Sequence, residues 1–474
     1  MPGNQGRSPS VKGYREDGHG TGGPGVTAKE LEAVGKFLFE RWMPAGPRTV
    51  RVARGRPVKA LLVSVETERL GMTVLPLGLG MVAAAARRAG HDVELLNVPA
   101  GAIPAESVTE AVTRFRPDVV GFSVRNVDDQ NMQSPRFLLP LVAEAVAACR
   151  VQTDAPVVVG GAGYSIFPRQ TLAYLGADLG VRGEGEAAFP EILRRLEAGD
   201  DVGGLPGVDV AGRAAGPPPA PTRNLDLLPF PDETTWRSVD PGDPELLLPV
   251  QSRRGCPLDC SYCSTASIEG RPIRFRSPAA VATHLARLCE AGFFRFYFVD
   301  NVFNLPPGYS LSLCREIAAL RLPIRWRCIL YPYALDGELA DAMAEAGCTE
   351  ASLGFESGSV AVLVAMNKRF RPGDVRTVSE ALARRGIRRN GFLLLGGPGE
   401  TRETIEESLA FADSLRLESL KITAGIRVYP GTPLAAQAVA DGLISPGDDL
   451  LYPRFYLAPG VREELSRLLA GRPG

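Results

Sequence analysis

"RRGCPLDCSYCST", residues 253–265, places Cys256, Cys260 and Cys263 within eight positions, in a chain that has eight cysteines among 474 residues. The spacing is Cys-x3-Cys-x2-Cys, with no fourth cysteine nearby. Structural zinc sites are closed by four protein ligands, whereas cysteine thiolates are the usual ligands of iron–sulfur clusters. Three thiolates can hold three irons of a 4Fe-4S cluster and leave the fourth iron open. A zinc loop and three incidental thiols are the alternatives.

The motif follows the first of six apolar runs of strand length, which alternate with helical patterns such as "PAAVATHLARLCEAG". This alternation predicts parallel βα units, too few for a closed eight-stranded barrel and enough for an open, partial (β/α)6 barrel over residues 246–434. Parallel barrels carry their chemistry at the carboxyl ends of the strands, and the cysteines lie at such an end. The six runs are "LLLPVQSRRG", "FRFYFVDN", "IRWRCILYP", "TEASLGFES", "NGFLLLGG" and "LKITAGIRVYP".

The N-terminal half shows the same rhythm and predicts a doubly wound, Rossmann-like α/β domain over residues 28–215, which begins with a helix near Ala28. The closely spaced prolines of residues 216–245 predict a linker, residues 1–27 a disordered tail, and residues 435–474 a short C-terminal segment. The strand candidates are "VKALLVSV", "HDVELLNV", "PDVVGFSV", "APVVVGGA" and "ADLGVRGE".

Overall charge is nearly balanced, with 53 basic and 54 acidic residues, so it does not recommend nucleic acid as a partner. No apolar stretch approaches the roughly 20 residues of a membrane helix, and the start of the chain has no hydrophobic region typical of a signal peptide. We therefore expect a cytoplasmic protein without a membrane span. The other cysteines lie in apolar patterns that predict core positions: Cys149, Cys289, Cys314, Cys328 and Cys348.

The cysteine spacing, with Tyr262 just before the last cysteine, resembles the radical S-adenosylmethionine (SAM) superfamily over about residues 246–434. The resemblance implies that the open iron chelates the amino and carboxylate groups of SAM. It also implies that one electron, from a flavodoxin- or ferredoxin-type donor, cleaves SAM to a 5′-deoxyadenosyl radical. An electron-transfer module without catalysis is the alternative from another class, and it would need a fourth ligand that the loop lacks.

The same resemblance implies further SAM-binding positions at strand ends. Asp300 and Asn301 in "FVDNVFN" are candidates for the amino end of SAM, although both could simply cap a loop. Glu356 and Ser357 in "LGFESGS" match positions used around the ribose and methionine portions. The glycines of "LLLGGPGET", Gly397 among them, would let the backbone approach adenine and ribose, or could form a tight turn.

The N-terminal half resembles the domain of cobalamin-binding radical SAM enzymes, through "LPLGLGMVAAAARRAGHDVELLNV", "PVVVGGAGYSIFP" and "GVRGEGEAAFPEIL". Cobalamin is therefore an expected cofactor, and Gly160, Gly161 and Gly163 would admit its nucleotide tail. The Asp-x-His-x-x-Gly loop that supplies a histidine to cobalt is missing, and His19, His91 and His284 are poor candidates for that ligand. The stretch "SVRNVDDQ" can fill this space with Ser123, Arg125, Asn126 and Asp128, or it is a solvated loop.

In the cobalamin-binding subgroup the commonest reaction is methylation of an unactivated carbon, in which a substrate radical takes a methyl group from methylcobalamin. Lipid-type members, hopanoid methylases among them, resemble this chain in the Arg-Asn-x-Asp stretch and in "RVYPGTPLA". We expect this reaction on a lipid or secondary metabolite. The alternative is a cobalamin-independent radical SAM dehydratase acting on a sugar or aminoglycoside diol. The substrate is expected to be a small polar or amphipathic molecule enclosed between the domains, near Tyr331, Tyr333, Arg427 and Tyr429.

Overall fold

A computed structural model describes residues 55–66, 75–237 and 239–469, all of which belong to one compact unit, Pro44–Gly474. The predicted tail (1–27) and the helix expected near Ala28 lie outside the described residues. The described chain contains two six-stranded sheets, one in each half of the sequence. Both are α/β sheets, as the alternation of apolar runs predicts.

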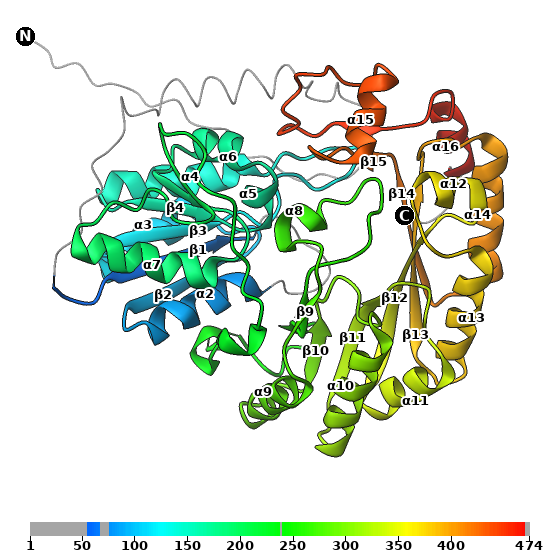
Figure 1. Cartoon of the computed structure of the whole chain (residues 1–474), viewed down its shortest axis with the longest axis horizontal. Coiled ribbons are helices and arrows are strands. Elements are labelled where there is room, and N and C mark those ends of the chain that lie inside the picture. The colour runs from blue at the N-terminus through cyan, green and yellow to red at the C-terminus, as the bar shows by residue number, and fades with distance from the viewer. Residues whose placement is uncertain (1–54, 67–74, 238, 470–474) are drawn as a thin grey trace, which may run out of the picture. The chain divides into compact units, whose positions relative to one another are not determined.

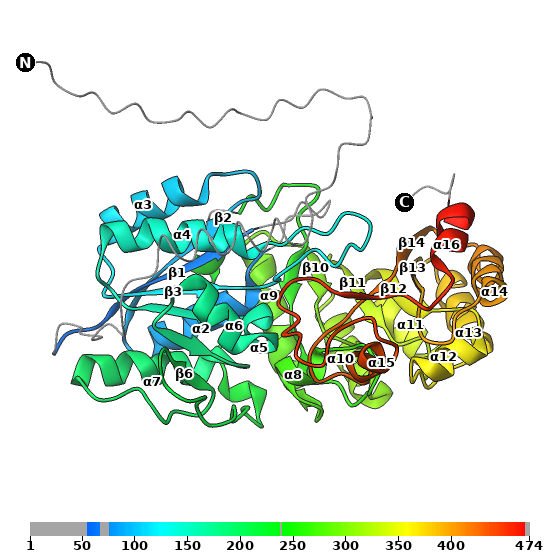
Figure 2. The ribbon, with the colours of Figure 1, turned by 90° about the horizontal axis from the view of Figure 1, so that it is seen from above.

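The N-terminal sheet has the strand order β2-β1-β3-β4-β5-β6 and is parallel except for β6. Helices α2 and α7 cover one face, and α3 and α4 cover the other (Figures 1 and 2). Strands covered on both faces are apolar throughout, which is why five of the six were visible in the sequence. The strands are β1 (Lys59–Val65), β2 (Asp92–Val98), β3 (Val119–Ser123), β4 (Val157–Gly160), β5 (Leu179–Val181) and β6 (Val208–Val210). The helices are α2 (Leu77–Arg88), α3 (Pro104–Phe115), α4 (Leu139–Gln152), α5 (Ala162–Ile166), α6 (Pro168–Leu175) and α7 (Gly185–Ala198).

The C-terminal sheet has the order β14-β13-β12-β11-β10-β7, and each strand pairs in parallel with the next strand of this sheet along the chain. Helices cover its outer face, so it forms the predicted open, partial (β/α)6 barrel (Figure 1). The strands are β7 (Leu248–Val250), β10 (Arg295–Phe298), β11 (Arg325–Leu330), β12 (Cys348–Glu356), β13 (Arg388–Leu395) and β14 (Ser419–Ala424). The helices are α9 (Pro278–Glu290), α10 (Pro307–Ala319), α11 (Gly337–Glu345), α12 (Val360–Ala365), α13 (Pro372–Ala383) and α14 (Arg402–Ser414).

Residues 216–245 join the two sheets as an extended segment with two short 3-10 turns, η1 (Leu225–Leu227) and η2 (Glu233–Trp236). The buried guanidinium of Arg276 donates to the carbonyls of Leu225 and Leu228, at 2.9 and 2.8 Å. Asp232 lies 3.3 Å from Arg87 of α2. The segment is therefore fastened to both halves of the chain.

Short elements complete the fold around the carboxyl ends of the barrel strands. Two small antiparallel pairs, β8 with β9 and β15 with β16, were not predicted, because strands of two residues leave no periodic pattern. Their bounds are β8 (Arg253–Arg254), β9 (Arg274–Phe275), β15 (Ile426–Arg427) and β16 (Phe455–Tyr456), and the remaining helices are α8 (Thr265–Glu269), α15 (Pro433–Ala440) and α16 (Arg462–Leu469). Across the described ranges, no helix has the length and apolarity to cross a bilayer.

Candidate active site

The cysteine loop is fastened to the barrel through its backbone. Gly255, which precedes Cys256, has φ +91°, and a Cβ there would lie 2.2 Å from the carbonyl oxygen of Pro272, so only glycine fits. The amide of Cys256 donates to Gly270 at 3.1 Å. Further on, the amide of Ser261 donates to Met366 at 3.0 Å, while the Ser261 carbonyl accepts from the amide of Leu434 at 2.9 Å. The loop is thus held on both sides of Cys260.

The three loop cysteines differ in exposure: Cys256 is buried, Cys260 is half-buried and Cys263 is exposed. Burial raises the pKa of Cys256 to about 11, and it also raises the pKa of Cys260. A metal must therefore bind to deprotonate these thiols. Among the described residues, no three His, Cys, Asp or Glu side chains converge on one point that could hold an ion. The charges of Cys260 and Cys263 act on Cys256, so the three thiols lie near one another, as ligands that bind separate irons of one 4Fe-4S cluster require.

The arginines before the loop point in opposite directions, as successive residues of a strand do. Arg253 turns into the barrel, where its guanidinium donates to Leu305 and lies 4.6 Å from the Tyr309 ring centroid. Arg254 turns toward the N-terminal sheet. Asp300, at the end of β10, accepts from the amides of Ser252 and Arg253 at 2.8 and 3.1 Å and is fully buried. Asp300 therefore fixes the backbone just before the cysteine loop.

A half-buried triad lies beside the loop. The hydroxyl of Tyr262 donates to Glu356 Oε1 at 2.9 Å, and the ammonium of Lys368 lies 3.1 Å from the same oxygen. Burial lowers the pKa of Lys368, but Glu356, Tyr262 and Cys260 outweigh it and raise the pKa well above its usual value. The Lys368 side chain is 5% exposed. Lys368 therefore stays charged next to the cysteine loop, where it can pair with a carboxylate.

Sequence reasoning named Tyr262 and Glu356 but missed Lys368. Lys368 follows α12, twelve positions after Glu356, and nothing in its local pattern distinguishes it from a surface lysine. A buried carboxylate such as Glu356 needs a partner, and that requirement was the available signal for a nearby cation.

At the remaining positions predicted to bind SAM, the polar groups already form hydrogen bonds with other groups of the protein. Ser357 is fully buried and its hydroxyl lies 2.8 Å from that of Ser408 on α14. The amide of Gly397 donates to Glu400 at 2.9 Å. The amide group of Asn301 donates to Glu269 at 2.5 Å. Contacts of Asp300, Asn301, Ser357 and Gly397 with SAM stay predictions.

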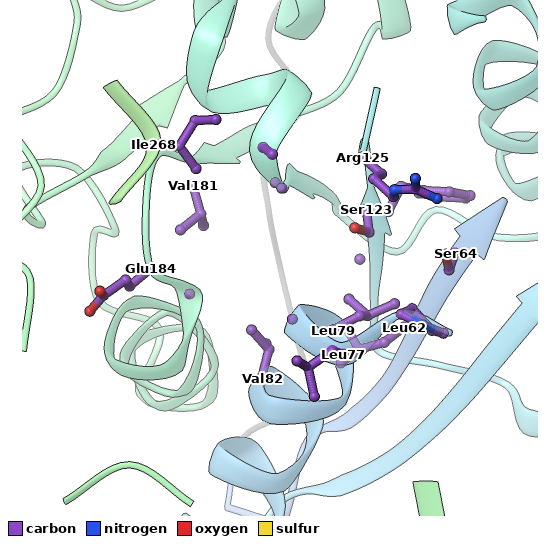
Figure 3. A pocket seen from close by; sticks show the side chains of 18 of the residues that line it. Leu62, Ser64, Leu77, Leu79, Val82, Ser123, Arg125, Val181, Glu184 and Ile268 are labelled. Atoms are coloured by element: carbon purple, nitrogen blue, oxygen red, sulfur yellow. The ribbon is translucent and has the colours of Figure 1, made fainter. Parts of the chain in front are cut away.

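A cavity of about 590 Å³ opens at the carboxyl edge of the N-terminal sheet (Figure 3). Its floor is formed by strand ends and by the start of α2, and its far wall comes from the barrel half. In Figure 3, Ser123 and Arg125 extend from the end of β3, across the hollow from Val181, Glu184 and Ile268. The barrel residues that line the cavity are Gln251, Arg254, Ile268, Glu269, Val299 and Asn301.

Most of the residues predicted for cobalamin line this cavity: Ser123, Arg125, Asn126, Gly160 and Gly161. Gly161 has φ +98°, and a Cβ there would lie 2.6 Å from the Val124 carbonyl oxygen. The side-chain oxygen of Asn97, also in the cavity wall, is buried without a hydrogen-bond partner among the described residues. An unsatisfied buried acceptor fits a ligand that carries amide donors, as the corrin ring does. The cavity therefore fits cobalamin.

Two other predicted positions lie outside the cavity. Gly163 is in α5, and its amide donates to the carbonyls of Val124 and Arg125 at 2.9 and 3.0 Å, so it shapes the loop rather than the cavity surface. Asp128 is buried and its carboxylate lies 2.7 Å from Arg427 Nε. Contact of Gly163 and Asp128 with cobalamin stays a prediction.

The described histidines lie away from the cavity lining. His91 accepts from the Val58 amide at 3.4 Å, and burial lowers its pKa. His284 stacks on Phe230 with ring centroids 4.0 Å apart, and burial lowers its pKa to about 3. His19 lies outside the described residues. Neither described histidine is placed to reach a metal in the cavity.

Four residues proposed for the substrate region lie near the carboxyl ends of barrel strands, but they are not equally accessible. Tyr333 is 49% exposed, whereas Tyr331 is buried and its hydroxyl accepts from the Arg369 amide at 2.8 Å. Arg427 is engaged by Asp128, and its guanidinium carbon lies 5.1 Å from the Tyr429 ring centroid. Arg427 therefore joins the two halves of the chain, and its predicted contact with substrate stays untested.

The partial parallel barrel carries a three-cysteine loop at its mouth, and the doubly wound domain joined to it has an open cavity at its carboxyl edge. This combination is typical of an enzyme with two neighbouring cofactor sites. Comparison with known families agrees. Residues 64–193 match the B12 binding domain, and residues 250–412 match the radical SAM superfamily.

The chain is 28% identical to an uncharacterised methyltransferase of Pyrococcus horikoshii, over 82% of this chain and 84% of that protein. It is 32% identical to the hopanoid C-3 methylase of Methylococcus capsulatus, over 51% of this chain and 45% of that protein. Among solved structures, the radical SAM methyltransferase TsrM of Kitasatospora setae, with tryptophan and a SAM analogue bound, superposes with a TM-score of 0.75 at 22% identity, over 86% of this chain and 87% of that one. That likeness shows the fold.

The chain belongs to the radical SAM enzymes that carry a B12-binding domain. Its cofactors are accordingly a 4Fe-4S cluster, SAM and cobalamin.

Proposed function

We propose that this enzyme transfers a methyl group from SAM, by way of cobalamin, to an unactivated carbon of a small lipid or secondary metabolite. One observation carries the proposal: Gln251, Arg254 and Glu269 line the cobalamin cavity and also flank the cysteine loop. The two cofactor sites therefore share a wall. The relatives named as methyltransferases support the reaction type, and the match to the B12 binding domain favours it over a cobalamin-independent dehydratase.

Bound cluster and SAM supply the radical, and bound cobalamin supplies a metal centre that accepts and passes on methyl. The residues of the chain would hold and orient these cofactors. Cys256, Cys260 and Cys263 would hold three irons. Lys368, charged and buried beside Glu356, is placed to bind the carboxylate of SAM.

Arg125 is the second feature of the proposal. It lies at the carboxyl end of β3, it lines the cavity, and its side chain is exposed and makes no ion pair with another described residue. An arginine cannot ligate cobalt because it carries no free lone pair at ordinary pH. With the described histidines elsewhere, we infer that Arg125, and no histidine of the described residues, would face the metal of bound cobalamin.

The direct test uses the full chain loaded anaerobically with cobalamin and 4Fe-4S cluster, then given a reductant and SAM labelled in its methyl group. The proposal predicts label in the corrin fraction and 5′-deoxyadenosine in solution. It also predicts that labelling the histidines of the protein with 15N leaves the cob(II)alamin EPR spectrum unchanged. Release of 5′-deoxyadenosine without any label in the corrin would overturn methyl transfer and favour the dehydratase alternative. A spectrum that changes with the histidine label would overturn the inference about Arg125.

A further inference from the structure

A continuous set of ion pairs and hydrogen bonds between buried and half-buried groups runs along the wall that the two cofactor sites share. It begins in the N-terminal half at "GEGE", where Glu184 and Glu186 flank the start of α7. Glu186 pairs with Nη2 of Arg254, and Glu184 lies 3.5 Å from Nη1 of the same guanidinium. The side chains of Arg254 and Glu186 are 7% and 3% exposed. Burial raises the pKa of Glu186, but Arg254 outweighs it and lowers that pKa, so the pair is ionised.

The set continues into the cysteine loop. Arg254 Nε donates to the Gln251 side-chain oxygen at 2.8 Å, and the Gln251 amide nitrogen donates to Glu269 Oε1 at 3.0 Å. Glu269 Oε2 then accepts from the backbone amide of Gly255 at 2.9 Å and from Asn301 at 2.5 Å. Gly255 is the residue directly before Cys256. Every link from the α7 glutamates to the first cysteine is therefore a direct contact between buried or half-buried groups.

The donors and acceptors allow one arrangement. Glu269 receives donors on both oxygens, so an amide in its place would set its own NH2 group against another donor. Rotating the Gln251 amide to relieve that conflict would place its NH2 against Arg254 Nε, which is also a donor. A change at Glu269 would therefore disturb the hydrogen bond of Gln251 with Arg254 as well. The orientation of the cysteine loop thus depends on the orientation of the cavity wall.

We propose that Glu269 and Arg254 are positioning residues that fix the cysteine loop relative to the cobalamin cavity, so that methyl and radical chemistry occur at a set separation. The inference rests on the proposed function for its purpose: both residues line the cavity, and the role assigned to them is to position the loop, not to take part in the reaction. Misplacement of reacting groups by about 1 Å can slow a reaction about 100-fold. Each cofactor can bind at its own site even when the two sites are misaligned, so the variants should keep both cofactors.

The test measures the distance between the cofactors without turnover. In the holoenzyme reduced to cob(II)alamin and a paramagnetic 4Fe-4S cluster, pulsed EPR reports the dipolar interaction between the two spins. We expect a narrow distance distribution in the unmodified protein and a broadened or shifted one in Glu269→Gln and Arg254→Lys, with cobalamin and iron content retained. Glu418→Gln is the matched control, because it alters a glutamate that pairs with Arg389 at 2.8 Å on other elements of the barrel.

Both variants should also lower the rate at which label from SAM reaches the corrin by about 100-fold, while 5′-deoxyadenosine formation persists. An unchanged distance distribution in both variants would overturn the proposal. If Glu269→Gln fails to retain its cluster, Arg254→Lys decides, because the Arg254 guanidinium contacts Gln251 and Glu186, whereas Glu269 holds the Gly255 amide next to Cys256. The EPR distance does not depend on methyl transfer, so a changed distance in a protein that never labels its corrin would sink the proposed function and leave this inference standing.

Discussion

Lys368 is the residue whose environment most strongly indicates a ligand. Its side chain is 5% exposed and shares Glu356 with Tyr262, and its charge also acts on Cys260. Burying an ion pair generally gives little net stability, so such a pair is weak support for a purely structural role. The carboxylate of SAM, brought to the open iron by the cysteine loop, is a natural further partner.

We predict that Lys368→Met weakens SAM binding to the cluster-loaded enzyme by roughly 10- to 100-fold, because a hydrogen bond to a charged group contributes about 1.5–3 kcal/mol. Lys368→Arg should retain most of the affinity. Equilibrium dialysis with labelled SAM measures the dissociation constant. Lys421→Met, which removes an exposed lysine of β14, is the control. Equal affinity in Lys368→Met and the control would remove Lys368 from the SAM site.

Glu400 offers a pH-dependent test at the same scale. Burial raises its pKa to about 7, against the opposing effect of the Gly396 and Gly397 amides, and its second oxygen has no hydrogen-bond partner among the described residues. A folded pKa above the unfolded value means that folding favours the protonated acid. Its contribution to stability is complete below about pH 4 and is lost as the pH rises through about 7.

Glu400→Gln should therefore flatten the fall in thermal midpoint between about pH 5 and pH 8. The pH dependence that the substitution removes is at most about 3 kcal/mol, since a tenfold change in an equilibrium constant corresponds to about 1.4 kcal/mol. Thermal melts of both proteins across this range measure it, with the exposed Glu407→Gln as control. A variant whose midpoint falls as steeply as that of the unmodified protein would show that Glu400 is not the group responsible.

At the scale of elements, the loop after β3 and the β15–β16 ribbon are joined by one buried ion pair. Asp128 and Arg427 are 1% and 2% exposed and lie 2.7 Å apart. Arg427 also donates to the Leu450 carbonyl at 2.7 Å. Removing one partner leaves a buried charge unpaired.

We expect Asp128→Asn to lower stability by about 3–5 kcal/mol and to increase hydrogen exchange in residues 426–458. The matched control is Asp201→Asn, whose partner Arg213 lies 2.9 Å away but whose pair is more than half exposed. Exposed pairs contribute about 0–1 kcal/mol. Equal effects of the two substitutions on the thermal midpoint would contradict a structural role for the buried pair.

The long elements were predictable because each parallel strand is a compact apolar run, as in "VKALLVSV" for β1 and "NGFLLLGG" for β13. The edge strand β6 was missed because Val208–Val210 is only three residues long. It also pairs antiparallel with β5, outside the alternation of parallel strands and helices that the sequence predicts. The same limit applies to β15 and β16. Pairs of two residues are decided by tertiary contacts, such as that of Arg427 with Asp128, and not by local pattern.

At the scale of the whole molecule, sequence reasoning located the cysteine loop and the five cavity residues predicted for cobalamin, because they belong to motifs or follow the ends of predicted strands. It could not foresee that Asp300 and Ser357 turn inward and are satisfied by protein, since that depends on how each strand end bends. The shared wall was also missed. Arg254, Glu269 and Glu184 are ordinary charged residues in the sequence, and they become a connected set when the two halves fold together.

The most direct test of the central claim concerns the loop. Wild-type protein and Cys256→Ala, Cys260→Ala and Cys263→Ala variants are loaded anaerobically with iron and sulfide, and their metal content and 5′-deoxyadenosine formation from SAM and dithionite are measured. The buried Cys289→Ala is the control. We predict about four irons per wild-type and control chain, with 5′-deoxyadenosine produced by both and by none of the three loop variants. Zinc in place of iron, or undiminished 5′-deoxyadenosine from any loop variant, would contradict the claim.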